Sequence, residues 1–255
     1  MPKYGLLVVE GPHDVEFVYR LLSPSGLARV QLDDHVDPFL KPLIPRIYPP
    51  DGDLLKRVPV PLFLQSATHA VAILSAIGDT RLVQTLEENA AVLDVAKLTG
   101  IGIILDSDSE KSARERYNAI RGRLLALGYV LPDAGGSVSP EPPRVGAFVL
   151  PDNLAQGTLE DILLDCAQHT YPTLLATAMM HVEAASVDVN LAEDDVRELR
   201  KPAGRNKATI GSVASILRPG RAIQVSLQDN RWLRDTALDL PACTRFGPFW
   251  ANASS

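Results

Sequence analysis

Cysteine is scarce in this chain: Cys166 and Cys243 are the two cysteines among its 255 residues. They lie far apart in the sequence, and two are too few for a disulfide framework or for the usual zinc-binding spacings. We therefore expect both to be packing residues of a protein that works in a reducing cytoplasm. With 46% hydrophobic residues, the chain has enough apolar material for a sizeable core without covalent cross-links.

Long uninterrupted apolar runs are also missing. Glu10 and Asp14 interrupt the apolar N-terminus before the apolar region of a signal peptide could form. Residues 58–78 carry no formal charge, but prolines and polar side chains break them up, so they fall short of a membrane-spanning run of about 20 apolar residues. We expect a soluble protein with no membrane association.

An excess of basic charge is absent as well, because 25 Lys and Arg residues face 31 Asp and Glu residues, for a net charge of −6. This balance argues against a protein that coats nucleic acid by bulk electrostatics. Residues 197–221 are the exception, with seven basic residues and one acidic residue, and we expect this basic segment to hold a phosphate backbone. The seven are Arg197, Arg200, Lys201, Arg205, Lys207, Arg218 and Arg221.

The apolar pattern that is present alternates between strands and helices. Residues 5–9 are continuously apolar, as in a strand buried on both faces, and helical spacing follows from Val15 to Leu22. A second unit runs from the apolar residues 101–105 to a helical face that ends at Gly128. Such alternation predicts an α/β fold with a central, mostly parallel sheet.

The rest of the chain divides into a core and a helical part. We expect residues 1–155 to form the α/β core and residues 156–255 to form a mainly helical C-terminal part that completes the site. Prolines make residues 33–61 an irregular insertion in that core. Further strands are predicted at 60–64 and in the sequence RVGAFVLPDN, and a long helix is predicted over 80–98.

Two helices are predicted in the C-terminal part from their ends. Thr158, with Asp161 three residues later, fits a capping box at the start of the first. The second covers residues 207–217 and is stopped by Pro219 and Gly220.

Carboxylates follow two of the predicted strands: Glu10 after the first, and Asp106 and Asp108 after the second. In a parallel α/β sheet, ligands bind beyond the carboxyl ends of the strands, so all three would lie at the functional edge. Three carboxylates there repel one another unless a cation neutralises them, and hard oxygen ligands suit Mg²⁺ or Mn²⁺. The alternative for each turn taken singly is that its acidic residue caps the following helix.

At these residues the sequence resembles the Toprim domain, the metal-binding fold shared by topoisomerases, bacterial primases and the OLD-type (overcoming lysogenization defect) nucleases. VVEGPHD is similar to its first motif, a glutamate at the end of the first strand, and IILDSDSE is similar to its second motif, Asp-x-Asp. The resemblance implies that Glu10 is a metal ligand or acid/base group, and that Asp106 and Asp108 hold divalent metal. It also implies that Asp14 belongs to the metal site.

The resemblance extends to two residues of the C-terminal part. Glu160, in GTLEDILL, matches a further acidic metal ligand at the start of a helix. Lys207, in RNKATIGSV, is the best match to a lysine that stabilises the transition state, and Lys201 is the second. The alternative for Glu160 is a favourable partner of the helix dipole in the first turn. The alternative for Lys207 is a solvated charge on an exposed helix.

The resemblance implies a Mg²⁺- or Mn²⁺-dependent nuclease that hydrolyses phosphodiester bonds, with phage defence as its setting. Metal activates water and steadies the leaving oxygen, and a lysine balances charge on the phosphoryl oxygens. The expected partner is nucleic acid, DNA in preference to RNA. Because the chain has no P-loop motif, the ATPase half of an OLD-type protein would come from a separate chain or be unnecessary. A homodimer is a further expected form of the protein.

Two other interpretations use the same residues. A non-catalytic or partner-activated Toprim module would keep the carboxylates to bind metal or a partner. A haloacid-dehalogenase-like phosphatase would use Asp106 as its nucleophile, but its Asp-x-Asp motif normally opens the fold, and that interpretation gives Glu10 no role.

Overall fold

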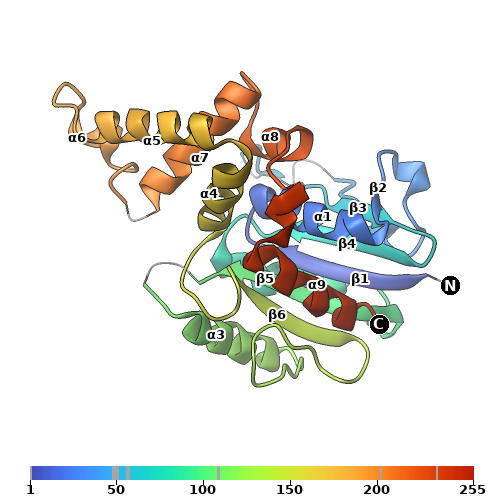
Figure 1. The fold of residues 1–255 in the computed structure, drawn as a ribbon. Coiled ribbons are helices and arrows are strands. Elements are labelled where there is room, and N and C mark those ends of the chain that lie inside the picture. Colours follow the sequence, from blue (N-terminus) through green and yellow to red (C-terminus); the bar gives the residue numbers. More distant parts are fainter. Residues whose placement is uncertain (1, 48–51, 56–57, 108–109, 202, 234) are drawn as a thin grey trace.

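The computed structural model describes residues 2–47, 52–55, 58–107, 110–201, 203–233 and 235–255. One six-stranded sheet has the order β2-β3-β4-β1-β5-β6 (Figure 1). Neighbours in the run β4-β1-β5-β6 are parallel, while β2 and β3 form an antiparallel edge, so the predicted α/β fold with a mostly parallel sheet is confirmed. The strands are β1 (Lys3–Val9), β2 (Ala28–Arg29), β3 (Leu62–Gln65), β4 (His69–Ser75), β5 (Leu98–Asp106) and β6 (Arg144–Leu150).

Helices cover both faces of the sheet. Buried residues of α2 and α3 share a core with one face, and buried residues of α1, α4 and α9 share a core with the other. The segment α5 to α7 extends sideways from the sheet (Figure 1). The helices are α1 (Pro12–Leu22), α2 (Leu82–Ala90), α3 (Ala113–Ala126), α4 (Leu159–Thr170), α5 (Pro172–Ser186), α6 (Glu193–Val196), α7 (Gly204–Leu217), α8 (Ile223–Asp229) and α9 (Pro241–Ala253).

The connections after two adjacent strands leave the sheet in opposite directions. The chain passes from β1 into α1 on one face, and from β5 towards α3 on the other face. In α/β proteins such a divergence forms a crevice at the carboxyl ends of the strands, and ligands bind there. Glu10, the residue after β1, and Asp106, the last residue of β5, lie at that point of the sheet.

The C-terminal helix α9 returns to the sheet and lies against β5 and β6. Glycines on the strands let it approach, because a Cβ on Gly100 would come within 2.0 Å of the Ala253 carbonyl oxygen. A Cβ on Gly5 would likewise lie 2.9 Å from the Trp250 ring. The chain beyond residue 155 therefore contributes two of the helices that cover the sheet, α4 and α9, as well as the segment α5 to α7.

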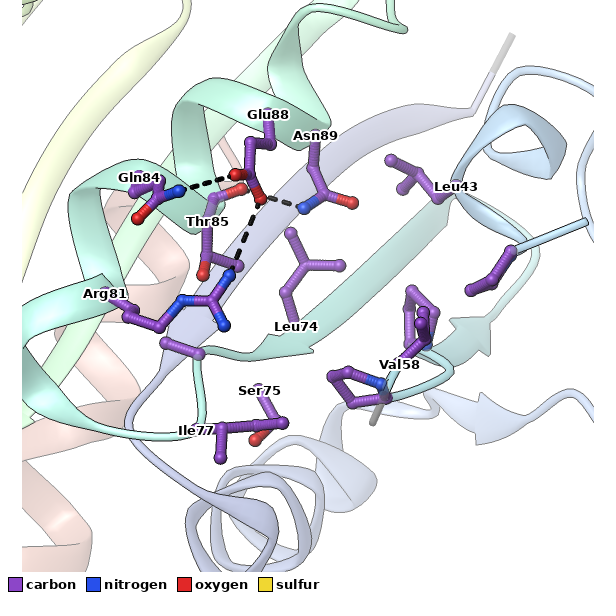
Figure 2. A pocket seen from close by; sticks show the side chains of 14 residues that line it. Leu43, Val58, Leu74, Ser75, Ile77, Arg81, Gln84, Thr85, Glu88 and Asn89 are labelled. Atoms are coloured by element: carbon purple, nitrogen blue, oxygen red, sulfur yellow. Dashed lines mark hydrogen bonds and ion pairs between the residues drawn. The ribbon is translucent and has the colours of Figure 1, made fainter. Parts of the chain in front are cut away.

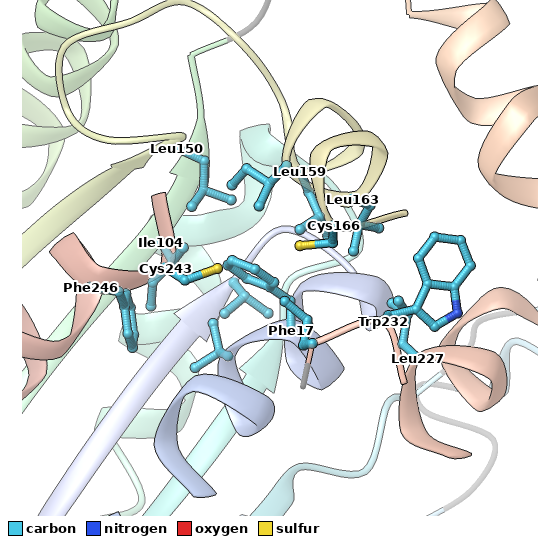
Figure 3. Packing of buried hydrophobic residues seen from close by; sticks show 14 of the residues in the cluster. Phe17, Ile104, Leu150, Leu159, Leu163, Cys166, Leu227, Trp232, Cys243 and Phe246 are labelled. Carbon is cyan, nitrogen blue, oxygen red and sulfur yellow. The ribbon is translucent and has the colours of Figure 1, made fainter. Parts of the chain in front are cut away.

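The core on the α1 side joins distant parts of the chain (Figure 3). Cys166 of α4 and Cys243 of α9 are both buried there as free thiols, close to Phe17 of α1 and Phe246 of α9. The expectation that both cysteines are packing residues is confirmed.

Two sequence predictions between β1 and β5 need correction. The predicted helix over 80–98 is too long, because α2 ends at Ala90, a turn with a Lys97 N–H to Asp94 carbonyl bond follows, and β5 already begins at Leu98. The predicted strand over 60–64 is β3, but β4 was missed. A tight turn, in which the Ser66 N–H donates to the His69 carbonyl, folds the uncharged stretch into two antiparallel strands.

The proline-rich insertion is irregular, as predicted: its described residues form 3₁₀ turns and bends, with no strand or α-helix among them. Val36, Leu40 and Leu43 are buried and pack into the core on the α2 side. Among the helices that the structure describes, none is both long and apolar enough to cross a membrane.

Candidate functional site

Glu10 and Asp14 come from the junction of β1 and α1. Gly11 is the N-cap of α1, and its N–H donates to Oδ2 of Asp14 at 2.9 Å. Asp14 is buried, and its Oδ1 has no hydrogen-bond partner. A Cβ on Gly11 would lie 3.3 Å from Oδ2 of Asp14, so the glycine leaves room for that carboxylate.

Asp106 joins three elements at the end of β5. Its Oδ1 accepts the N–H of Leu159, the first residue of α4, at 2.9 Å. Its own N–H donates to Oε1 of Glu10 at 3.0 Å. The first strand, β5 and the start of α4 are therefore tied together through these two carboxylates.

The start of α4 is fixed by a local network. Ser107 Oγ accepts the Gly157 N–H at 2.7 Å and donates to the Gly157 carbonyl at 3.0 Å. The Thr158 N–H donates to Oδ2 of Asp161 at 2.7 Å, which confirms the predicted capping box. Glu160 follows in the first turn, half-buried beside the crevice.

The carboxylates are close enough to perturb one another. Burial raises the pKa of Asp14 to about 7, and the charges of Glu10 and Glu160 act in the same direction. Burial also raises the pKa of Asp106 well above its usual value, with further increases from Asp14, Glu10 and Glu160. Of the five predicted metal ligands, Glu10 and Glu160 thus lie within electrostatic reach of both Asp14 and Asp106. The fifth, Asp108, lies outside the described residues.

Arg116 of α3 supplies positive charge that the sequence did not predict. Its guanidinium contacts Oε1 of Glu10 at 3.2 Å, Oδ2 of Asp79 at 3.1 Å and the Asp106 carbonyl at 2.9 Å. An arginine one turn into a helix usually points to solvent, so its position carried no signal. Only the fold shows that this face of α3 turns towards the ends of β1 and β5.

Lys207 and Glu160, the two predicted site residues of the C-terminal part, line the same cavity. The α7 helix brings Lys207 to this cavity of about 170 Å³, whose lining is His13, Glu160, Leu163, Lys207, Ile210 and Ile223. Burial lowers the pKa of His13; the charge of Lys207 lowers it further, and that of Glu160 opposes the change. Asn206 Nδ2 donates to Oδ1 of Asp161 at 2.8 Å, which holds α7 to the start of α4.

Whether these residues fit a metal ion depends on the type of their donor atoms and on how the side chains are grouped. Carboxylate oxygens are suitable donors for Mg²⁺ or Mn²⁺, and the buried Oδ1 of Asp14 lacks a partner. Yet within the described ranges no three His, Cys, Asp or Glu side chains are grouped so that they could hold a metal ion. Because Asp108 is outside these ranges, a full ligand set would depend on that residue.

Most of the positive charge of the basic segment, residues 197–221, is paired with acidic side chains in the structure. Of its seven basic residues, five pair with acidic side chains of α5, α6, α8 or the segment itself. The pairs are Arg197 with Asp194, Arg200 with Glu193, Lys201 with Glu198, Arg205 with Glu183 and Arg218 with Asp229. Two basic residues, Lys207 and Arg221, make no ion pair with any described residue.

Comparison with known proteins gives a family and a shared fold. No curated protein matches the chain. The crystal structure of the hypothetical protein PH0156 from Pyrococcus horikoshii OT3 is similar, with a TM-score of 0.51 and 17% identity over 96% of this chain and 99% of that one. At this identity the likeness is one of fold. A family model matches residues 4–246, and the chain therefore belongs to the family described as Protein of unknown function (DUF3226).

Proposed function

We propose that the protein is a Mg²⁺- or Mn²⁺-dependent nuclease of the Toprim type that hydrolyses phosphodiester bonds of nucleic acid. One observation carries the proposal: Glu10 and Glu160 lie near Asp14 and Asp106 at one edge of the sheet, where burial and these neighbouring charges raise the pKa values of Asp14 and Asp106. Such crowding disfavours the charged forms, and it is the arrangement expected where a bound cation restores them. Asp108 completes the ligand set in this proposal.

The chemistry divides between the cation and the chain. A divalent cation supplies an activated water and stabilises the leaving oxygen. Arg116 holds Glu10 at the crevice and fixes its orientation. Lys207, exposed at the rim, places positive charge where the phosphoryl oxygens become more negative. The bond between Asn206 and Asp161 keeps Lys207 in reach by fixing α7 to α4.

The test combines metal titration with cleavage. Calorimetry with Mn²⁺ and Mg²⁺ should show binding by the wild type that Asp106→Asn and Asp108→Asn each abolish. Asp165→Asn, which alters an exposed acid of α4, should bind as the wild type does. Supercoiled DNA, linear DNA, single-stranded DNA and tRNA should then be incubated with each protein and metal. Products made by the wild type and by Asp165→Asn, but not by Asp106→Asn, are expected; equal cleavage by Asp106→Asn would overturn the proposal.

A second candidate is a non-catalytic or partner-activated Toprim module. The observation that favours it is Arg116, which already neutralises part of the charge of Glu10 and Asp79 without any metal. This candidate expects metal or partner binding with no cleavage of the four substrates. A protein that binds Mn²⁺ through Asp106 and leaves every substrate intact would favour it over the nuclease.

A further inference from the structure

A second cavity, of about 260 Å³, lies at the carboxyl end of β4, on the opposite side of β1 from Asp106. Figure 2 shows its walls: Gln84 and Asn89 of α2 on one side, Leu74 and Ile77 at the strand end, and Val58 of the proline-rich insertion opposite. This volume lies just below the ~300–1,000 Å³ of typical small-molecule pockets, so it suits one small group, such as part of a larger ligand.

The cavity shares a loop with the carboxylate site. The Gly78 N–H donates to the Glu10 carbonyl at 2.9 Å, and the Ala76 N–H donates to the Val9 carbonyl at 2.9 Å. Asp79, the next residue of the loop, pairs with the Arg116 that contacts Glu10. A ligand that lies across the end of β1 would therefore reach both places.

The charges of the lining select against ions. Arg81 and Glu88 both line the cavity and face each other at 4.0 Å, and Gln84 Nε2 donates to Glu88 at 2.8 Å (Figure 2). Glu88 disfavours a phosphate and Arg81 disfavours a cation. The favoured occupant is neutral and polar at its edge, because amide and hydroxyl groups stand beside apolar walls.

Two features of the cavity lining are not explained by contacts among the described residues. Oγ of Ser75 is buried with no hydrogen-bond partner. Ile77 has a φ of 54°, a left-handed conformation that a β-branched residue rarely adopts, and its side chain is half exposed at the cavity. Strain of this kind gathers at ligand sites, where a side chain is needed despite its backbone cost. A ligand that accepts from Ser75 and packs on Ile77 would account for both.

We propose that this cavity binds an unpaired nucleobase of the strand whose phosphate lies at the carboxylate site. The inference rests on the proposed nuclease function and names its substrate class: single-stranded nucleic acid or a frayed strand end. A base is neutral, planar and rimmed with hydrogen-bonding groups, as the lining requires. It enters the cavity only after leaving its stack, so a continuous duplex is excluded.

Binding without metal tests the proposal separately from cleavage. A short fluorescein-labelled oligothymidylate is titrated with protein at low salt in EDTA, and its anisotropy is followed. The wild type should bind it, free deoxynucleosides should displace it, and relaxed circular duplex DNA should not. Ile77→Gly removes the apolar wall and Ser75→Ala the buried hydroxyl, and each should weaken binding by on the order of tenfold.

The matched control is Val92→Ala, which removes an exposed apolar side chain just beyond α2 and outside the cavity, and it should bind as the wild type does. Circular dichroism checks that each variant is folded. No binding by the wild type, no displacement by nucleosides, equal competition by the circle, or unchanged binding by both cavity variants would each overturn the base site. Lost base binding with intact metal-dependent cleavage refutes the cavity alone, whereas intact binding without cleavage refutes the nuclease alone.

Discussion

At the scale of single residues, Asp14 links the site to stability. Its folded pKa of about 7 lies above the usual 3.8, so the folded state holds this proton over a pH range where the unfolded chain has lost it. The free energy of unfolding therefore falls as pH rises from about 4 to about 7. Asp106, whose pKa is also raised, acts in the same direction.

Asp14→Asn should remove part of that pH dependence. The amide oxygen still accepts the Gly11 N–H, while no charge has to be buried. In a chelating buffer, the loss of unfolding free energy between pH 4 and pH 7 should shrink by on the order of 3–4 kcal/mol relative to the wild type. Urea denaturation at a series of pH values measures this. A control, Asp165→Asn, should follow the wild-type curve, and an identical slope in Asp14→Asn would contradict the burial argument.

Of the arginines of α3, we expect Arg116 to cost the most unfolding free energy when it is replaced by alanine. Arg116→Ala leaves Glu10 without its paired guanidinium in a part of the protein where the arginine side chain is only 10% exposed. Removing one partner of a buried pair costs about 3–5 kcal/mol. Arg121→Ala, on the same helix, breaks an exposed pair with Asp133 and should cost about 0–1 kcal/mol. Thermal and urea unfolding compare the two, and equal costs would show that Arg116 is not needed to balance the carboxylates.

The sequence predicted this site unevenly. Glu10 and Asp106 could be assigned to one edge because parallel strands present their carboxyl ends together, and this follows from the order of apolar runs alone. Arg116 and Asp79 could not, since their roles depend on which face α3 and the loop after β4 turn towards the crevice. The chemical roles of all these residues remain predictions.

At the scale of elements, α9 depends on a groove that glycine creates. In Gly100→Ala, the new methyl group would lie 2.0 Å from the carbonyl oxygen of Ala253, far closer than the two atoms can approach. A backbone atom cannot swing aside as a side chain can, so α9 must shift, at a cost of about 1–3 kcal/mol or more. We expect a lower melting temperature and faster proteolysis near the C-terminus.

Gly122→Ala is the matched control for Gly100→Ala. Gly122 is exposed within α3, and a Cβ there would meet no atom within 4 Å. Alanine favours a helix over glycine by about 0.5–1 kcal/mol, so this variant should be more stable than the wild type. If both variants change stability in the same direction, the close approach of α9 is not what makes Gly100 necessary.

The elements themselves show how far local patterns reach. The strands β1, β5 and β6 were predicted because each is an isolated apolar run with a polar exit. β4 was missed because it follows β3 within one uncharged stretch, and α2 was overextended because its apolar period continues into β5. The seating of α9 on the sheet depends on contacts between residues about as far apart as the chain allows, which no local pattern encodes.

At the scale of the whole molecule, the net charge and the ion pairs of the basic segment both predict weak electrostatic binding of nucleic acid. The chain carries a net charge of −6, and five of the seven basic residues of the segment 197–221 are engaged in ion pairs. Only basic groups that meet phosphates release counterions. Lys207 and Arg221 are the two in this segment with no acidic partner among the described residues.

The salt dependence of single-strand binding should therefore be shallow. Two phosphate contacts give a slope of log K against log salt of about −1.4, whereas seven would give about −5. Anisotropy of the labelled oligothymidylate, measured in EDTA over a range of salt concentrations, yields the slope directly. Lys207→Gln should flatten it by about 0.7, and Asp229→Asn, which releases Arg218 from its ion pair, should steepen it by a similar amount. A wild-type slope near −5 would mean that the ion pairs of this segment open when nucleic acid binds, and the segment would then be the backbone-binding surface that its sequence alone predicts.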